Sequence, residues 1–203
     1  MTITAPEKSL QIVLIRHGQT EWNAEKRFLG KSDIPLDQVG HQQARNFASS
    51  LSFSFDAVYT SPLARASQTA QYLQPAATVV PTLQELDQGD LEGMVGMDAL
   101  QKYPEFFAAW ASDPSQLPVP GGESMEQCRI RALDAIQTIG QNHSQNQRVA
   151  VVSHQMVIAS ILCTLSNTHL RDWRHWRLGN LEAAWLHYPN GRLSIKHPKW
   201  NPQ

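Results

Sequence analysis

The chain has 203 residues, enough for one domain with a hydrophobic core of its own. Its 17 basic and 18 acidic side chains give a formal net charge of −1, which disfavours partners that need a strong field, such as nucleic acid or an anionic membrane. The longest apolar run, residues 157–165, is shorter than the roughly 20 residues that span a bilayer. Residues 1–9 lack the apolar segment of a secretory signal, so we expect an N-terminal tail on a cytoplasmic protein.

Cysteine and histidine spacing gives no metal signature. Cys128 and Cys163 lie far apart, and free buried thiols are expected, with one disulfide left open as the alternative. The eight histidines form neither an HExxH nor a His-x-His pattern. We therefore expect no metal and no cofactor.

The first half of the chain alternates strand and helix patterns. Residues 11–15 are typical of a buried parallel strand, and apolar residues from Leu36 to Leu51, Val39 among them, recur at helical spacing. A second strand is predicted over residues 57–60. Ser61-Pro62 is then expected to cap and open a helix that reaches about Leu73, before a short strand at 78–80.

The second half begins with an aromatic and proline-rich segment, residues 91–122, expected to be a helical excursion that covers the main body. Ser124 to Gln127 matches a capping box, and the helix that follows is expected to end at Gly140. Strands are predicted at 149–152, 183–188 and 193–196, the last two joined by an Asn-Gly hairpin turn. This order predicts an α/β three-layer sandwich, with a mostly parallel sheet between helices, as a single domain over residues 10–203.

Basic side chains follow the predicted strand ends. Arg16 and His17 end the first strand, Arg65 lies in the helix after the second, and His154 follows the strand at 149–152. Carboxyl ends of parallel strands share one edge of a sheet, so these groups should meet there. Guanidinium groups match phosphate oxygens, and helix N-termini at Ser61 and after His154 would add N–H donors. The pattern predicts a phosphate site.

These residues belong to blocks that resemble the histidine phosphatase superfamily, with its phosphoglycerate-mutase-like fold. The blocks keep the family's order over residues 11–188. They are Leu14–Asn23, Asp33–Leu36 with Gly40, Ser61–Ala70, Leu83–Glu85, Gly89–Gly93, Gly122–Ser124 and Val152–His154.

The resemblance implies a role for each matching residue. His17, with an ordinary pKa of about 6.5, would be the nucleophile that carries the phosphoryl group. Arg16, Arg65 and His154 would bind its oxygens, with Asn23 as a further ligand. Glu85 would be the proton donor, its pKa raised by the facing dianion. Glu92 is the competing carboxylate, to which we assign a structural role beside a turn at Gly93.

Two positions depart from the family pattern. Gln155 replaces a common glycine and is expected to crowd the site and contact substrate, and Leu91 replaces a bulky tryptophan of the pocket wall. Gln155 with Trp176-Arg177 gives a partial likeness to α-ribazole phosphatases. The basic-aromatic stretch 171–177 is expected to be a helix whose tryptophans pack on the sheet while its arginines reach solvent, rather than a nucleic-acid face.

The predicted function is metal-independent hydrolysis of a small phosphorylated metabolite through a phosphohistidine. A phosphoglycerate mutase and a non-catalytic phospho-ligand-binding protein are the alternatives, and the oligomeric state is left open. Mutases of the family have an arginine after the catalytic glutamate, where this chain has Leu86-Asp87, and Asp87 would repel a carboxylate. The excursion holds one cation, Lys102, among aromatic residues, so aryl and neutral-alcohol phosphates are the expected substrates.

Overall fold

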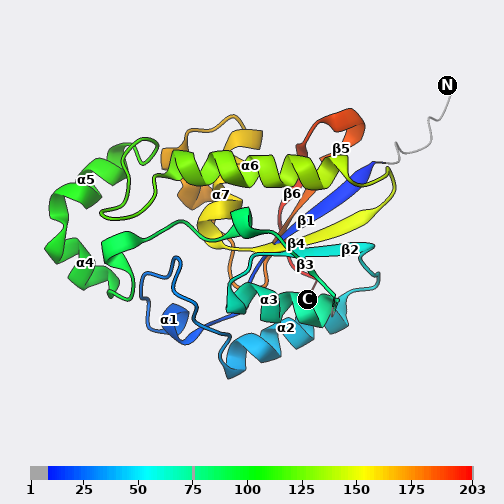
Figure 1. Cartoon of the computed structure of the whole chain (residues 1–203), viewed down its shortest axis with the longest axis horizontal. Helices are drawn as coiled ribbons and strands as arrows, with labels where there is room; N and C mark the ends of the chain where they lie inside the picture. The colour runs from blue at the N-terminus through cyan, green and yellow to red at the C-terminus, as the bar shows by residue number, and fades with distance from the viewer. Residues whose placement is uncertain (1–8, 75, 203) are drawn as a thin grey trace.

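A computed structural model describes residues 9–74 and 76–202 (Figure 1). The expected N-terminal tail, residues 1–9, lies outside the described residues except for Ser9. None of the helices in the described ranges is long and apolar enough to cross a membrane. Both cysteines are buried and free, as expected.

A six-stranded sheet forms the centre of the protein, in the order β3-β2-β4-β1-β5-β6. Strands β3, β2, β4 and β1 pair in parallel, whereas β5 pairs antiparallel with β1 and with β6. The strands are β1 (Leu10–Arg16), β2 (Ala57–Thr60), β3 (Thr78–Val79), β4 (Arg148–Ser153), β5 (Ala183–Tyr188) and β6 (Ser194–Trp200). The mixed but mostly parallel sheet confirms the predicted fold class.

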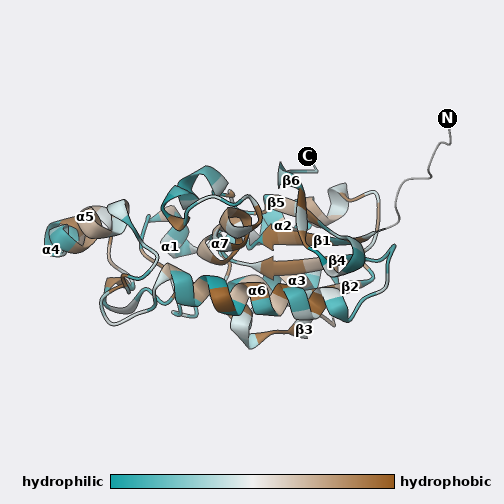
Figure 2. Ribbon diagram, turned by 90° about the horizontal axis from the view of Figure 1, so that it is seen from above, coloured by the Kyte–Doolittle hydropathy of each residue, from teal (hydrophilic) through white to brown (hydrophobic). Residues whose placement is uncertain are grey.

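Helices cover both faces of the sheet, which gives three layers. Helices α6 (Met125–Gln141) and α7 (Gln155–Leu165) cover one face, and α2 (Gln38–Ser50) and α3 (Ala64–Leu73) cover the other (Figure 1). Side chains alternate along β1, so Ile12 and Leu14 join the core under α6 and α7, while Val13 and Ile15 join the core under α2 and α3. Figure 2 shows the apolar strands enclosed between these layers.

The predicted excursion is present and lies beyond the carboxyl ends of the parallel strands. It contains α4 (Gly96–Lys102) and α5 (Pro104–Ser112), at one end of the molecule, away from the sheet (Figures 1 and 2). The remaining short elements are α1 (Glu21–Ala24) and the 3-10 turns Pro81–Leu83, Gly89–Leu91, Leu170–Trp176 and Pro189–Gly191. Between β5 and β6 the chain turns over residues 188–193, which is longer than a two-residue hairpin, and Asn190 and Gly191 both have positive φ there.

Ser61 does not cap α3, contrary to prediction. The helix begins at Ala64, and its first N–H donates to the Asp33 carboxylate over 2.6 Å. Ser61 Oγ instead accepts from Leu63 N and lies 2.8 Å from His154 Nε2. The Ser61 hydroxyl therefore binds His154 instead of the helix, and Asp33, which is distant in sequence, caps α3.

Three smaller expectations were also wrong. Gly140 lies inside α6 rather than after it, and a Cβ there would come within 2.9 Å of the Tyr188 ring, so packing explains this glycine. Val39 is 51% exposed and does not join the apolar face of α2. Residues 170–176 form a 3-10 helix whose tryptophans, Trp173 and Trp176, pack towards α7 rather than on the sheet.

The backbone at Gly40, in the first turn of α2, approaches the loop after β1 too closely for a side chain. A Cβ at Gly40 would lie 2.1 Å from Gln19 O, whereas one at Gly96 would meet nothing within 4 Å. We expect Gly40→Ala to lower the free energy of unfolding by about 1–3 kcal/mol, the usual cost of overpacking. Gly96→Ala should leave it unchanged or slightly higher. Urea denaturation measures both, and equal stability of the two variants would contradict the close approach.

Candidate active site

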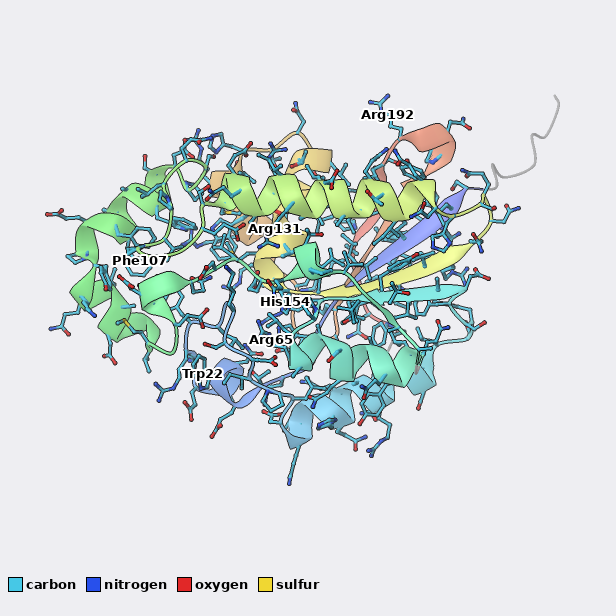
Figure 3. All side chains as sticks on the ribbon, viewed as in Figure 1. Trp22, Arg65, Phe107, Arg131, His154 and Arg192 are labelled. Atoms are coloured by element: carbon cyan, nitrogen blue, oxygen red, sulfur yellow. The ribbon has the colours of Figure 1, made fainter. Side chains whose placement is uncertain are left out.

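The predicted catalytic side chains meet at the carboxyl edge of the sheet. Arg16 ends β1 and His17 follows it, His154 follows β4, and Arg65 lies at the start of α3 beside β2. Figure 3 shows His154 and Arg65 close together between the two helical layers. The rings of His17 and His154 have centroids 5.1 Å apart. The structure therefore brings these four residues to one place.

His17 is buried, with 3% of its surface exposed. Its Nδ1 donates to Gly18 O over 2.7 Å, and Gly18 N donates to Thr69 Oγ1 over 3.1 Å. This arrangement assigns the proton to Nδ1 and leaves the lone pair on Nε2. Nε2 has no hydrogen-bond partner in the part of the chain that the structure describes. Its lone pair is available to a reactant.

Arg65 is completely buried and is held by neutral acceptors. Its Nη2 donates to Gly30 O over 2.7 Å and its Nη1 to Ser32 O over 2.8 Å, while Nε donates to His154 Nδ1 over 3.3 Å. Burial lowers the pKa of Arg65 to about 10, so the group stays charged at neutral pH. Among the described residues no carboxylate forms an ion pair with it. The site therefore contains a buried cation without a direct ion pair, whose charge Glu85, Glu92 and Asp33 partly balance from nearby.

Arg16 adds a second positive charge. Its Nη1 donates to Leu178 O over 2.7 Å, and its buried Nε has no hydrogen-bond partner among the described residues. Burial lowers the pKa of Arg16, opposed by the charge of Glu85. Buried N–H groups are rarely left without an acceptor. An oxyanion between Arg16 and Arg65 would satisfy these donors.

Both histidines are neutral at physiological pH. Burial first, and then the charges of Arg65 and Arg16, lower the pKa of His17 well below 6.5. The ordinary pKa expected from sequence was therefore wrong. Burial, and then the charge of Arg65, also lowers the pKa of His154 well below 6.5. Because Nδ1 of His154 accepts from Arg65, the proton of this ring lies on Nε2, which faces Ser61.

Glu85 lies in the same buried region, 5% exposed. Its carboxylate accepts from Leu86 N over 2.8 Å and from Met156 N, in the first turn of α7, over 3.2 Å. Burial raises the pKa of Glu85, while these N–H groups and the two arginines oppose the rise. Burial therefore raises this pKa in the protein itself, and the further rise expected from a bound dianion stays a prediction. At Met156 the helix N-terminus after His154 binds this carboxylate, not the phosphate predicted there.

Arg131, from α6, fixes the backbone of Glu85. Its guanidinium donates to Gln84 O over 2.6 Å and to Glu85 O over 3.1 Å, and it pairs with Glu123 over 2.7 Å. Sequence analysis did not identify Arg131. Glu123 could have pointed to Arg131, because it pairs with Arg131 and belongs to one of the family blocks, but sequence analysis gave Glu123 no role.

Comparison with known proteins agrees with this geometry. The sequence model of the histidine phosphatase superfamily (branch 1) matches residues 12–201. The chain belongs to this family. The described residues contain no group of three or more His, Cys, Asp or Glu side chains that could hold a metal ion.

Named relatives of this histidine phosphatase include phosphatases and mutase-like proteins. The chain is 38% identical to a metal-independent phosphoserine phosphatase of Arabidopsis thaliana, over 74% of this chain and 66% of that one. It is 30% identical to phosphoserine phosphatase 1 of Hydrogenobacter thermophilus, over 92% and 90%. Phosphoglycerate mutase-like protein 4 of A. thaliana is 36% identical over 74% and 69%.

A solved structure shares the whole fold. A putative α-ribazole-5′-P phosphatase of Escherichia coli K-12 superposes with a TM-score of 0.83 and 25% identity, over 95% of this chain and 97% of that one. Membership of this family and similarity to these phosphatases identify the chain as a phosphatase.

The remaining predicted residues of this histidine phosphatase border the centre. Asn23 Oδ1 accepts from Thr20 N and from Asn180 Nδ2, so its oxygen is used internally and only its NH2 group is left for a ligand. Gln155 Oε1 accepts from Leu178 N, and its buried Nε2 has no partner among the described residues. Substrate contact by Asn23 and Gln155 stays a prediction.

Glu92 contacts the loop that holds Arg65. Its Oε1 accepts from Lys31 N over 2.6 Å, next to the Gly30 carbonyl that binds the guanidinium. Gly93 has a φ of +75°, which supports the turn predicted there. The structural role assigned to Glu92 is compatible with these contacts.

Asn180 is a residue that sequence analysis missed. Its Nδ2 donates to His17 O over 2.9 Å across 163 positions of sequence. It thereby fixes the backbone of His17. No local pattern around residue 180 indicates this contact, because only the folding of β5 beside β1 creates it.

The depressed pKa of His17 can be measured directly. We expect its imidazole to remain neutral as the pH falls through 6.5, because burial and two arginines disfavour the cation. The unfolded chain then binds more protons than the folded one, so the free energy of unfolding should decrease below about pH 6.5. Nitrogen-15 NMR titration of the histidines, with His17→Gln to assign the signal, provides the test. A midpoint at or above 6.5 would contradict the prediction.

Proposed function

We propose that this phosphatase hydrolyses phosphate monoesters of small metabolites through a phosphohistidine on His17. The observation that carries the proposal is a buried neutral imidazole with a free Nε2, beside two arginines that form no ion pair among the described residues. A buried cation without a partner is costly, and a phosphate dianion would remove that cost.

In the first step Nε2 of His17 attacks phosphorus in line with the ester oxygen. A bond forms between nitrogen and phosphorus while the bond from phosphorus to the leaving oxygen breaks. Arg16 and Arg65 stabilise the equatorial oxygens as negative charge spreads over them. His154 can donate its Nε2 proton to one oxygen by releasing Ser61 Oγ.

Glu85 supplies the proton to the leaving alcohol. Its raised pKa favours the protonated form, which a general acid requires. In the second step water attacks phosphorus, so that a bond between oxygen and phosphorus forms while the bond between phosphorus and Nε2 of His17 breaks. The carboxylate left on Glu85 by the first step accepts a proton from that water, and inorganic phosphate leaves. Glu85 and His17 then return to their starting states.

The mutase alternative is less favoured. Leu86 stands where mutases of the family have an arginine. Asp87 contributes less to this argument than sequence analysis expected, because it pairs with Lys31 over 2.7 Å and is not a free repelling charge. The non-catalytic alternative is disfavoured because His17, Arg16, Arg65, Glu85 and His154 form one connected site.

We further propose that residues 10–203 act as one domain, with residues 91–122 as the cover of the site. Two free thiols support a reducing, cytoplasmic setting.

The phosphoenzyme tests the function. During brief incubation with a 32P-labelled monoester we expect label on His17 alone, acid-labile and alkali-stable, with turnover that persists in EDTA and is inhibited by vanadate. Label on His154 or on a serine would contradict the mechanism, and so would activity that needs a divalent ion.

Replacement of the two carboxylates separates their roles. Glu85→Gln should lower kcat for alkyl phosphates by about 10²–10⁴, the worth of general acid catalysis. The defect should shrink for p-nitrophenyl phosphate, whose leaving group needs no proton. Glu92→Gln is the matched control and should lower kcat equally for both esters through the Arg65 loop. The opposite pattern would transfer the acid role to Glu92.

A further inference from the structure

Glu85 lies in a segment without regular secondary structure. The 3-10 turn Pro81–Leu83 ends before it, and residues 84–88 belong to neither a helix nor a strand. The buried side chains of Leu83 and Leu86 anchor this segment in the core. A general acid must, however, be held within about 0.5 Å of its working position. The backbone of the segment therefore needs a restraint of its own.

The Arg131 guanidinium supplies this restraint from α6. Its Nη1 donates to Thr82 O over 2.8 Å and to Gln84 O over 2.6 Å, and its Nη2 donates to Glu85 O over 3.1 Å. Figure 3 shows Arg131 on the side of α6 towards His154. One side chain thus binds three of the four carbonyls from residue 82 to residue 85.

Glu123 holds the guanidinium in the orientation that these bonds need. Its two carboxylate oxygens accept from Nε and Nη2 of Arg131 over 2.8 and 2.7 Å. These two bonds and the three to carbonyls account for the five N–H groups of an arginine. Burial opposes the charge of Arg131, but Glu123 outweighs burial, so the pKa of Arg131 is raised and the group stays charged.

The same pair joins Glu85 to the cover, residues 91–122. Glu123 directly follows the cover, and its N donates to Asp87 O over 3.1 Å, while Asp87 N donates to its Oε2 over 3.3 Å. A Cβ at Gly122 would lie 2.3 Å from Asp87 O, so the two ends of the cover are in close contact. Arg131 therefore fixes the segment of Glu85 relative to both α6 and the base of the cover.

We infer that Arg131 is a positioning residue for the proton donor, and that through Glu123 and the three carbonyls it holds Glu85 where the leaving alcohol is protonated. This inference rests on the proposed function, because it takes Glu85 as the general acid. Arg131 acts through the backbone of Glu85 and needs no contact with substrate. Its loss should slow the transfer that needs a proton and spare the transfer that needs none.

Two esters that share a ring measure this role. The leaving oxygen of phenyl phosphate needs a proton, whereas that of p-nitrophenyl phosphate needs none. We expect Arg131→Gln to lower kcat/KM for phenyl phosphate by about tenfold to a hundredfold, the cost of a misplacement of about 1 Å. The value for p-nitrophenyl phosphate should stay close to that of the wild type, so the ratio of the two values should fall.

Further variants separate positioning from a general effect on α6. Arg131→Lys should keep part of the ratio, because an ammonium group cannot reproduce the planar fork. Glu123→Gln should lower the ratio, since it weakens the orientation of Arg131. Arg129→Gln is the matched control and should keep the wild-type ratio, because Arg129 pairs with Glu126 within the same helix. A wild-type ratio in folded Arg131→Gln, or an equal fall in Arg129→Gln, would overturn the inference.

A double-mutant cycle distinguishes positioning from stability. When Glu85 is replaced by Gln, Arg131 has no acid to position. The double variant Glu85→Gln/Arg131→Gln should therefore have the same kcat/KM for phenyl phosphate as Glu85→Gln alone. Two losses that multiply would contradict the inference. Circular dichroism checks that each variant is folded, and if Arg131→Gln is not, the ratio and the cycle are measured with Glu123→Gln by the same criteria.

Failure of the inference and failure of the proposed function have different results. If Glu85→Gln lowers the ratio of phenyl to p-nitrophenyl phosphate but Arg131→Gln and Glu123→Gln do not, the inference is overturned and the proposed function stands. If the wild-type chain releases phosphate from neither ester, the proposed function is overturned and the inference with it.

Discussion

The burial of the Arg65 guanidinium is the interaction on which the site depends. A fully buried cation must have its N–H groups satisfied, and here two backbone carbonyls and one imidazole nitrogen supply the acceptors. The carbonyls come from Gly30 and Ser32, so the loop after α1 must lie against α3. The imidazole is His154, whose tautomer is thereby fixed. These acceptors are neutral, and the carboxylates that act on Arg65 do so without a direct ion pair, so its charge can still attract an anionic ligand.

Two consequences follow for the chemistry. Burial, and after it the charge of Arg65, lowers the pKa of both neighbouring histidines, so His17 keeps its lone pair. Glu85 is buried near the same cation. Burial raises the pKa of its carboxyl group and favours the protonated form, whereas the N–H donors lower this pKa and favour the carboxylate. His17 and Glu85 thus obtain opposite pKa shifts from one environment.

The fold provides this environment through the parallel part of the sheet. The ends of β1 and β4 pair directly, Arg16 beside Ser153, so the residues that follow them emerge together. The two cores hold β1 and β4 from both faces, which makes the position of those ends rigid. The cover and the segment after Trp176 lie beyond these ends.

The sequence alone predicted the α/β sandwich, because strand and helix periodicities are local. It also predicted the meeting of His17, Arg16, Arg65 and His154, since each follows a strand or opens a helix at one edge of a parallel sheet. The contacts of Ser61, Arg131 and Asn180 came only from the tertiary structure, because their partners are distant in sequence. The same holds for the pKa shifts, which depend on burial. Lys26 and Arg177 line one depression of the surface, and only the folded chain brings these two charges together.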